Sequence, residues 1–337
     1  MHEDWRATCA SLVSVLLAAA CGAGAHAEAN ENGSLLTDPP VRFLTGGAQD
    51  LWPCFSPDGT RILFSRRVRA TWELYLVPAM GGPAVKFAAS PLPVAATRAN
   101  WSRQGNVIAF TGTSSDGKSK VWLINPDGSS AHELEVTGLS DNLFYPSWYP
   151  DGKQIAAMDG VSYSITRIDL PKGIATTMTD PARVYTGMPS VSPDGKWIAF
   201  AGQQNKGQPY DQTKNSIWLL GAGGETRLVE SEQIQGRAPT WSPSGERLLF
   251  ESNRSSSQGL YAIFVINRDG TGITRLTDPA LNADHPVWSP DGVHIAFSAH
   301  DATQLGAGRG IGIIDRPESG ASPASESTPV RKSLVLP

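Results

Sequence analysis

Residues 286–298 read PVWSPDGVHIAFS, and five similar stretches precede this one along the chain. They are PCFSPDGTRILFS from Pro53, ANWSRQGNVIAFT from Ala99, PSWYPDGKQIAAM from Pro146, PSVSPDGKWIAFA from Pro189 and PTWSPSGERLLFE from Pro239. Successive copies start 46, 47, 43, 50 and 47 residues apart. A repeat of this length is typical of a propeller blade built from four strands.

Each copy predicts a tight hairpin. The Asp-Gly pair of the turn, as at Asp291 and Gly292, provides the positive φ that such a turn needs, and the apolar run after it predicts the second strand. A third strand follows every copy, for example WELYLVPA from Trp72, and a fourth strand follows in the first five units. The repeats therefore predict an all-β, six-bladed β-propeller with four antiparallel strands per blade.

The sixth unit has no fourth strand of its own. Residues 41–45, VRFLT, lie before the first copy and resemble the fourth strand ITRLT at residues 273–277. We expect this N-terminal strand to pair into the last blade and close the ring, which removes exposed strand edges. The C-terminal segment VRKSLVLP, residues 330–337, is an alternative partner for that edge. Closure predicts that residues 41–315 form one domain, whereas an open array of six repeats would leave residues 41–45 without a role.

The N-terminus predicts export from the cytoplasm. Arg6, the apolar run at residues 12–20 and the sequence Ala25-His26-Ala27 indicate a secretory signal peptide over residues 1–27. The apolar run is too short to span a bilayer, which needs about 20 residues. We therefore expect a periplasmic or secreted bacterial protein.

Three further features concern the chain ends and the cysteines. Cys21 leaves open an alternative in which the protein is a lipoprotein anchored through that residue, the one case in which we expect membrane association. Residues 28–40 form a short linker, and the Ser/Pro-rich residues 316–337 predict a disordered tail. After signal cleavage only Cys54 remains, so no internal disulfide can form.

The charge of the chain excludes one class of partner. The formal net charge is −4, with no basic stripe along the sequence. A nucleic-acid binder should present a concentrated basic surface, so we expect no nucleic-acid partner. We expect the protein to be a monomer.

The W-S-P-D-G-x-x-I-A-F unit, with its downstream L-T strand, resembles the WD-like repeat of TolB-like β-propellers over roughly residues 41–315. This resemblance implies a periplasmic propeller that binds partner proteins of the outer-membrane Tol-Pal system across its funnel. TolB also carries an N-terminal α/β domain, whereas here only residues 28–40 separate the signal from the propeller. The chain therefore resembles a stand-alone propeller that lacks the α/β domain.

The sequence contains few signs of an enzyme active site. There is no G-x-S-x-G elbow, and of the mature chain's His132, His285, His294 and His300 only His285 precedes an innermost strand. A three-histidine site, as in oligogalacturonate lyase propellers, is therefore not indicated, and we expect no metal and no other cofactor. Residues 112–119, GTSSDGKS, match the P-loop pattern but lie between two expected strands, which predicts a hairpin loop.

The innermost strand of each blade supplies the candidate site. Side chains alternate along a strand, so the residues one and three before the blade-core aromatic position should face the central channel. The nearer ring is small: Cys54, Asn100, Ser147, Ser190, Thr240 and Val287. The farther ring is chemically mixed: Trp52, Arg98, Tyr145, Met188, Ala238 and His285. Asp50, Arg237 and Asp284 are rim candidates near the same mouth.

Aromatic residues and arginine are the anchors that carry most binding energy in protein recognition. We therefore predict a non-enzymatic protein- or peptide-binding module of the cell envelope, with no catalytic residue and a partner that the sequence does not identify. The predicted contacts are Trp52, Arg98, Tyr145, Met188, His285, Arg237, Asp284 and Asp50. The alternative is a carbohydrate-active or lactone-cleaving propeller enzyme that uses the same funnel.

Overall fold

The computed structural model describes residues 39–46, 48–88, 92–137, 140–228, 235–300 and 308–315. The chain divides into two units, Met1–Thr37 and Asp38–Pro337, and the described residues all belong to the second. The predicted signal peptide, nearly all of the predicted linker and the predicted tail lie outside the described residues, as does Cys21.

Three antiparallel sheets each take four consecutive strands, in chain order. They are β10 (Leu143–Trp148), β11 (Gln154–Asp159), β12 (Ser164–Asp169) and β13 (Ile174–Thr177); β14 (Val184–Val191), β15 (Ile198–Gln204), β16 (Ser216–Gly221) and β17 (Gly224–Arg227); and β18 (Gly236–Trp241), β19 (Arg247–Ser252), β20 (Ala262–Asn267) and β21 (Thr274–Arg275). The expected antiparallel, four-stranded blades are therefore confirmed.

The first two repeats differ from this expectation, because they share one eight-stranded sheet. Its strands are β2 (Asp50–Phe55), β3 (Arg61–Val68), β4 (Thr71–Pro78), β5 (Val85–Lys86), β6 (Ala95–Trp101), β7 (Ile108–Thr113), β8 (Ser119–Ile124) and β9 (His132–Glu133). A single parallel pair, Trp72 with Ala95, joins β4 to β6. Within each half the strands pair antiparallel, so each half repeats the four-stranded arrangement.

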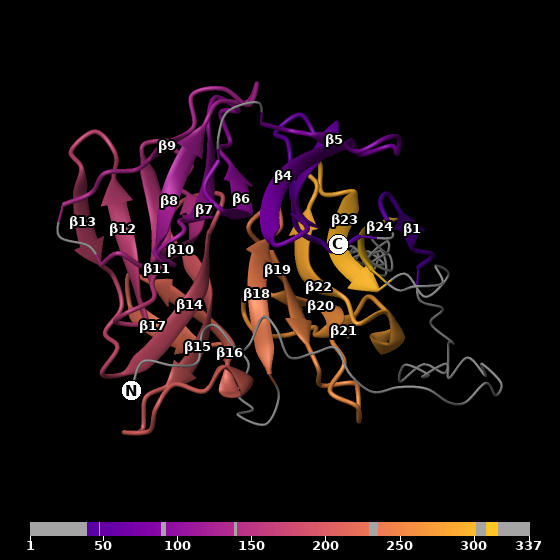
Figure 1. The fold of residues 1–337 in the computed structure, drawn as a ribbon. Coiled ribbons are helices and arrows are strands. Elements are labelled where there is room, and N and C mark those ends of the chain that lie inside the picture. The colour runs from indigo at the N-terminus through magenta and orange to yellow at the C-terminus, as the bar shows by residue number, and fades with distance from the viewer. Residues whose placement is uncertain are drawn as a thin grey trace, which may run out of the picture. The chain divides into compact units, whose positions relative to one another are not determined.

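The last sheet combines the two ends of the described chain. Its order is β1 (Arg42–Phe43), β24 (Arg309–Asp315), β23 (His294–His300) and β22 (Asp284–Trp288). Arg42 pairs with Ile313, and Phe43 pairs with Gly312, so indigo β1 lies beside yellow β24 in Figure 1. The prediction that the N-terminal strand joins the last repeat is confirmed, whereas the alternative strand at residues 330–337 lies outside the described residues.

The repeated turn is held by its own side chains. In the first copy, the Ser56 hydroxyl and the Thr60 N–H both donate to Asp58 Oδ1, and the Gly59 N–H donates to the Ser56 carbonyl at 2.8 Å. Gly59 has a φ of 71°, which explains the glycine at this position. The Ser56 hydrogen bond, followed by those from Thr60, lowers the pKa of Asp58 to about 2. The Asp-Gly pairs are thus turn elements, as predicted.

The blade core is repeated as regularly as the turns. The predicted core position is 3–7% exposed in every copy: Phe55, Trp101, Trp148, Val191, Trp241 and Trp288. The second strands add fully buried phenylalanines: Phe64, Phe110, Phe200, Phe250 and Phe297. Outside the sheets, the described residues hold the short 3-10 helices η1 (Gln212–Lys214) and η2 (Pro279–Leu281). No helix in the described ranges combines the length and apolar character needed to cross a membrane.

We predict that Gly310→Ala destabilises the protein through the closing strand. An added Cβ at Gly310 would collide with the carbonyl oxygen of Thr45, which belongs to the predicted closing segment. Overpacking of this kind costs about 1–3 kcal/mol, which thermal unfolding measures as a lower Tm. Gly223→Ala is the control, because nothing lies within 4 Å of a Cβ there. Equal melting temperatures for the two variants would contradict the role of residues 41–45.

Candidate functional site

One cavity is lined by the same three positions of each innermost strand. It holds about 670 Å³ of empty space, part of which is open to solvent. Both predicted rings line it, so the structure brings together the far-ring residues Trp52, Arg98, Tyr145, Met188, Ala238 and His285. The residue between the two rings, a proline in every copy except Ala99, also lines the cavity, which simple alternation does not predict.

A bulge at the far ring explains why three consecutive positions face the cavity. All six far-ring residues have a positive φ, between 47° and 57°. At each of them the pairing with the second strand shifts register, as between Leu51 and Cys54. The left-handed region costs a non-glycine residue about 1–2 kcal/mol, and such strain clusters at functional sites. Because none of the six is glycine, the sequence carries no sign of this geometry.

Side chains from neighbouring sheets hold the backbone at three of these strained positions. The N–H donors and their acceptors are Trp52 to Ser298 Oγ (3.2 Å), Tyr145 to Thr111 Oγ1 (3.1 Å) and His285 to Glu251 Oε2 (2.7 Å). Each acceptor directly follows the buried phenylalanine of a second strand. These acceptors position the far-ring residues, and none of them was predicted from the sequence.

The near ring also connects adjacent innermost strands. Its hydrogen bonds are Trp101 N–H to Cys54 Sγ (3.4 Å), Trp148 N–H to Asn100 Oδ1 (3.2 Å), Val191 N–H to Ser147 Oγ (3.0 Å) and Thr240 Oγ1 to the Pro286 carbonyl (2.9 Å). The same ring lines a second cavity, so it forms the layer between the two. Burial raises the pKa of the Cys54 thiol to about 11, which keeps it protonated and unreactive.

Arg98 lies between two aromatic rings at the mouth of the first cavity. Its Cζ atom is 4.4 Å from the centroid of Trp52 and 4.3 Å from that of Tyr145. Trp52 also packs against Trp72, with ring centroids 4.9 Å apart. These cation–π contacts fix the plane of the guanidinium group.

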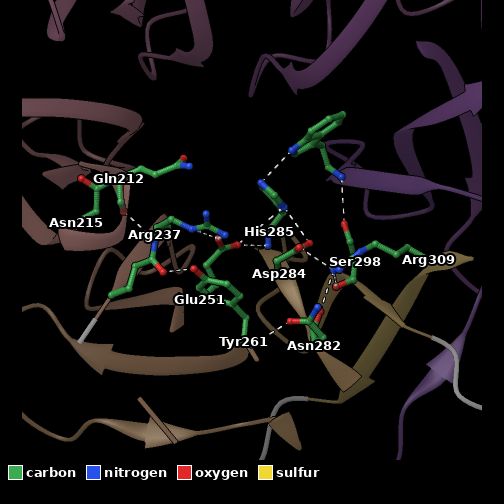
Figure 2. A network of polar contacts seen from close by, with 12 residues as sticks. Gln212, Asn215, Arg237, Glu251, Tyr261, Asn282, Asp284, His285, Ser298 and Arg309 are labelled. Atoms are coloured by element: carbon green, nitrogen blue, oxygen red, sulfur yellow. Dashed lines mark hydrogen bonds and ion pairs between the residues drawn. The ribbon is translucent and has the colours of Figure 1, made fainter. Parts of the chain in front are cut away.

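His285 links the first repeat to the last. Trp52 Nε1–H donates to His285 Nε2 at 2.9 Å, so Nδ1 is the protonated nitrogen and donates to Asp284 Oδ1 at 2.9 Å. Asp284 Oδ2 in turn pairs with Arg309 Nη2 at 2.7 Å. Figure 2 shows His285 beside Asp284, with Arg309 on the far side of the carboxylate. Arg309 was not predicted from the sequence.

The three predicted rim residues are paired inside the protein and do not line the cavity. Arg237 contacts Glu251 Oε1 at 2.7 Å and 2.6 Å, through Nε and Nη2. Asp50 accepts two hydrogen bonds of 2.7 Å from Arg66. Asp284 is the partner of Arg309. These three side chains therefore form ion pairs within the protein beside the cavity.

A family model described as the TolB beta propeller domain matches residues 45–214, half of the chain. The chain belongs to this family. The TolB-family chain is 31% identical over 210 residues to the uncharacterized protein Atu1656 of Agrobacterium fabrum, covering 60% of this chain and 65% of that protein. It is 31% identical over 178 residues to the Tol-Pal system protein TolB of Francisella tularensis, covering 52% and 39%. It thus spans less than two thirds of these curated relatives.

Solved structures share the fold of this TolB-family chain. A structure from Agrobacterium tumefaciens with a provisional TolB assignment aligns with a TM-score of 0.61 at 20% identity, covering 82% of this chain and 97% of that one. An oligogalacturonate lyase in complex with manganese aligns with a TM-score of 0.51 at 15% identity, covering 83% and 94%. At these identities the likeness shows the fold alone.

One cluster in the TolB-family chain has the residue types of a metal site. Ligand atoms of Glu251, Asp284 and His285 lie within 4.8 Å of one another. Both carboxylates are already paired with arginines, and both His285 ring nitrogens are hydrogen-bonded. The two carboxylate oxygens on the other side accept hydrogen bonds from His285, Glu251 Oε2 from its backbone N–H and Asp284 Oδ1 from Nδ1. A divalent ion would have to displace these hydrogen bonds from carboxylates that arginines already neutralise, so the arrangement is that of a neutralised ion-pair network.

Two other sequence features have structural roles. Residues 112–119 connect β7 to β8 in a hairpin, where Ser114 N–H donates to the Lys118 carbonyl at 2.9 Å. The hairpin prediction for the P-loop-like stretch is confirmed. His294 Nδ1 contacts Asp315 Oδ1 at 2.9 Å, which links neighbouring strands.

We predict that Ala238→Gly leaves stability unchanged or raises it by up to about 1 kcal/mol, because glycine relieves the left-handed strain at φ 47° while adding unfolded-state entropy. Ala175→Gly is the matched control, since Ala175 is also half-buried but lies in β13 without a positive φ. The control should lose about 0.5–1 kcal/mol in chemical denaturation. If both variants lose the same stability, the strain argument fails.

We predict that the effect of Asp284→Asn on stability depends on pH. Burial raises the pKa of Asp284, but its interactions with His285, Arg309 and Arg237 outweigh burial and hold the pKa below its ordinary value. The carboxylate's contribution is therefore complete above the unfolded pKa of about 3.9 and is lost as pH falls through the folded pKa.

The variant should be less stable than the parent at neutral pH, by up to about 3–5 kcal/mol for a broken buried pair. Denaturant unfolding at neutral pH and near pH 3 measures the difference, which should shrink in acid. A difference that stays constant would contradict the ionised pairing of Asp284 with Arg309.

Proposed function

We propose that the chain is a ring-closed, six-bladed propeller that acts as a non-enzymatic protein- or peptide-binding module of the bacterial cell envelope. Two observations support six blades. The eight-stranded sheet is two four-stranded units joined by one residue pair, and innermost strands of all six repeats line one cavity. The pairing of β1 with β24 supplies the closing contact.

The observation that carries the functional proposal is the far ring of the cavity. Its six residues share one strained backbone conformation, but their side chains include aromatic, cationic, imidazole and aliphatic groups. A common scaffold that presents different groups at equivalent positions suits recognition of an irregular surface, such as a peptide. Trp52, Arg98 and Tyr145 are of the types that dominate binding energy at interfaces.

Similarity to a Tol-Pal system protein and the predicted signal peptide support a periplasmic location for this monomeric module. Its partner would be an envelope protein or a peptide segment of one. Anchoring through Cys21 would hold the same module at a membrane, without changing the cavity.

The enzyme alternative has less support from the site. Cys54 is protonated, and both ring nitrogens of His285 are hydrogen-bonded within the protein. Glu251 and Asp284 are neutralised by arginines. The described cavity thus offers aromatic and guanidinium surfaces for binding, but no free general base beside a nucleophile.

We predict that changing Trp52 and Arg98 together to alanine abolishes capture of an envelope partner. The tagged parent protein is used to isolate partners from an envelope extract, and any partner is then purified and its affinity measured. Removing two anchors should weaken binding at least about a hundredfold, since each costs about 2 kcal/mol or more. A control variant with Arg67 and Met80 changed to alanine alters exposed residues away from the cavity.

Both variants must first show parent-like circular dichroism, so that loss of binding is not loss of folding. If the purified partner binds the double variant as tightly as it binds the parent, the cavity lined by Trp52 and Arg98 is not the binding site.

A further inference from the structure

Arg98 differs from the other arginines at this end of the innermost strands. Arg66, Arg237 and Arg309 each contact a carboxylate at 2.6–2.7 Å. Across the described ranges, Arg98 has no carboxylate within ion-pair distance. Its contacts are the two aromatic rings and one long hydrogen bond, from Nη1 to Thr97 Oγ1 at 3.3 Å.

The aromatic contacts leave the edge of the guanidinium group unused. Trp52 and Tyr145 interact with the positive charge of Arg98 through their ring faces. These rings accept no hydrogen bond from the N–H groups that lie in the plane of the guanidinium. Arg98 Nε is buried and has no hydrogen-bond partner among the described residues. Arg98 as a whole is half-buried and lines the cavity, and the one hydrogen bond of its Nη groups among the described residues is the long one to Thr97. The remaining Nη donors can therefore be completed by a ligand in the cavity.

We propose that Arg98 binds a carboxylate of the partner, so that the cavity selects an acidic peptide segment. The proposal rests on the peptide-binding function proposed above. A carboxylate matches the planar fork of the guanidinium group and forms two parallel hydrogen bonds with it. Because Asp50, Glu251 and Asp284 are neutralised by their own arginines, the mouth keeps the uncompensated positive charge of Arg98.

The aromatic pair around Arg98 gives the site its selectivity. Trp52 is tied to His285 by its indole N–H, and the backbone of Tyr145 is tied to Thr111. The guanidinium plane is therefore preorganised, and a ligand pays little for orienting it. Lysine at this position would keep the charge but lose both the planar fork and the stacking.

The test uses three blocked or free tripeptides as probes. Acetyl-Gly-Asp-Gly-amide carries a side-chain carboxylate, acetyl-Gly-Gly-Gly carries only a C-terminal carboxylate, and acetyl-Gly-Asn-Gly-amide carries neither. Each is titrated to millimolar concentration into the folded protein, and the indole N–H signal of Trp52 is followed by NMR. The spectrum of Trp52→Phe identifies that signal among the ten tryptophans.

We expect at least one carboxylate peptide to shift the Trp52 signal, and the neutral peptide to leave it unchanged. Arg98→Gln should weaken the binding roughly tenfold to hundredfold, the range for hydrogen bonds to a charged group, and Arg98→Lys should fall between. Which carboxylate peptide binds more tightly distinguishes an internal acidic residue from a chain end.

Arg61→Gln is the matched control and should bind like the parent. Arg61 also stacks on a tryptophan, with Cζ 5.5 Å from the Trp101 ring, but it does not line the cavity.

Three results overturn the proposal. They are no shift with either acidic peptide, an equal shift with the neutral peptide, and parent-like binding by both Arg98→Gln and Arg98→Lys. The isolated envelope partner separates this failure from failure of the proposed function. If that partner loses affinity for Trp52→Ala but not for Arg98→Gln, the funnel binds a partner without a carboxylate contact. If neither variant affects it, both proposals fail.

Discussion

The left-handed residue in each innermost strand is the constraint on which the site depends. A regular strand would direct every second side chain towards the channel. Here the bulge turns the far-ring residue, the following residue and the near-ring residue towards one cavity. The strained N–H groups of Trp52, Tyr145 and His285 then bond to side chains of neighbouring sheets. The same local distortion therefore shapes the cavity and ties the sheets together.

The contacts between the first and last sheets also help to build the site. Trp52 lies on β2 and contacts both Ser298 and His285, which lie on β23 and β22 of the last sheet. That sheet is completed by β1, immediately before β2 in the chain. No chain segment connects β2 directly to β22, so non-covalent contacts hold the two strands together: the polar contacts of Trp52 and an apolar cluster that includes Phe55 of β2 and Val287 of β22. The last sheet thus orients the indole ring on which Arg98 stacks.

Features that recur in every repeat can be predicted from the sequence, whereas contacts between different repeats or distant strands cannot. Six copies of one pattern were enough to predict the turns, the core aromatics and two of the three positions that line the cavity, because each follows from spacing within one unit. Glu251 and Arg309 could not be predicted, because their partners lie in other units or across the sheet. The shared sheet of the first two repeats depends on one pair, Trp72 with Ala95, which no periodicity encodes. The left-handed geometry was hidden because non-glycine residues adopt it.

One residue directly follows the core position of each second strand. Its chemical type differs between the repeats and separates the far-ring residues into two groups. In three repeats this residue accepts a hydrogen bond from the strained N–H of the next innermost strand: it is Ser298, Thr111 or Glu251. In the repeat before Arg98 it is Ser65, whose hydroxyl has no partner among the described residues. It is Met158 or Ala201 before Met188 and Ala238, where the side chain offers only a weakly accepting sulfur or no acceptor at all. The aromatic, cationic and imidazole groups thus lie on the part of the ring where polar acceptors are available. The fixed backbone of Trp52 and Tyr145 keeps their aromatic faces aligned with Arg98. The asymmetry of the mouth therefore follows from the second strands, one layer behind the residues that a partner would touch.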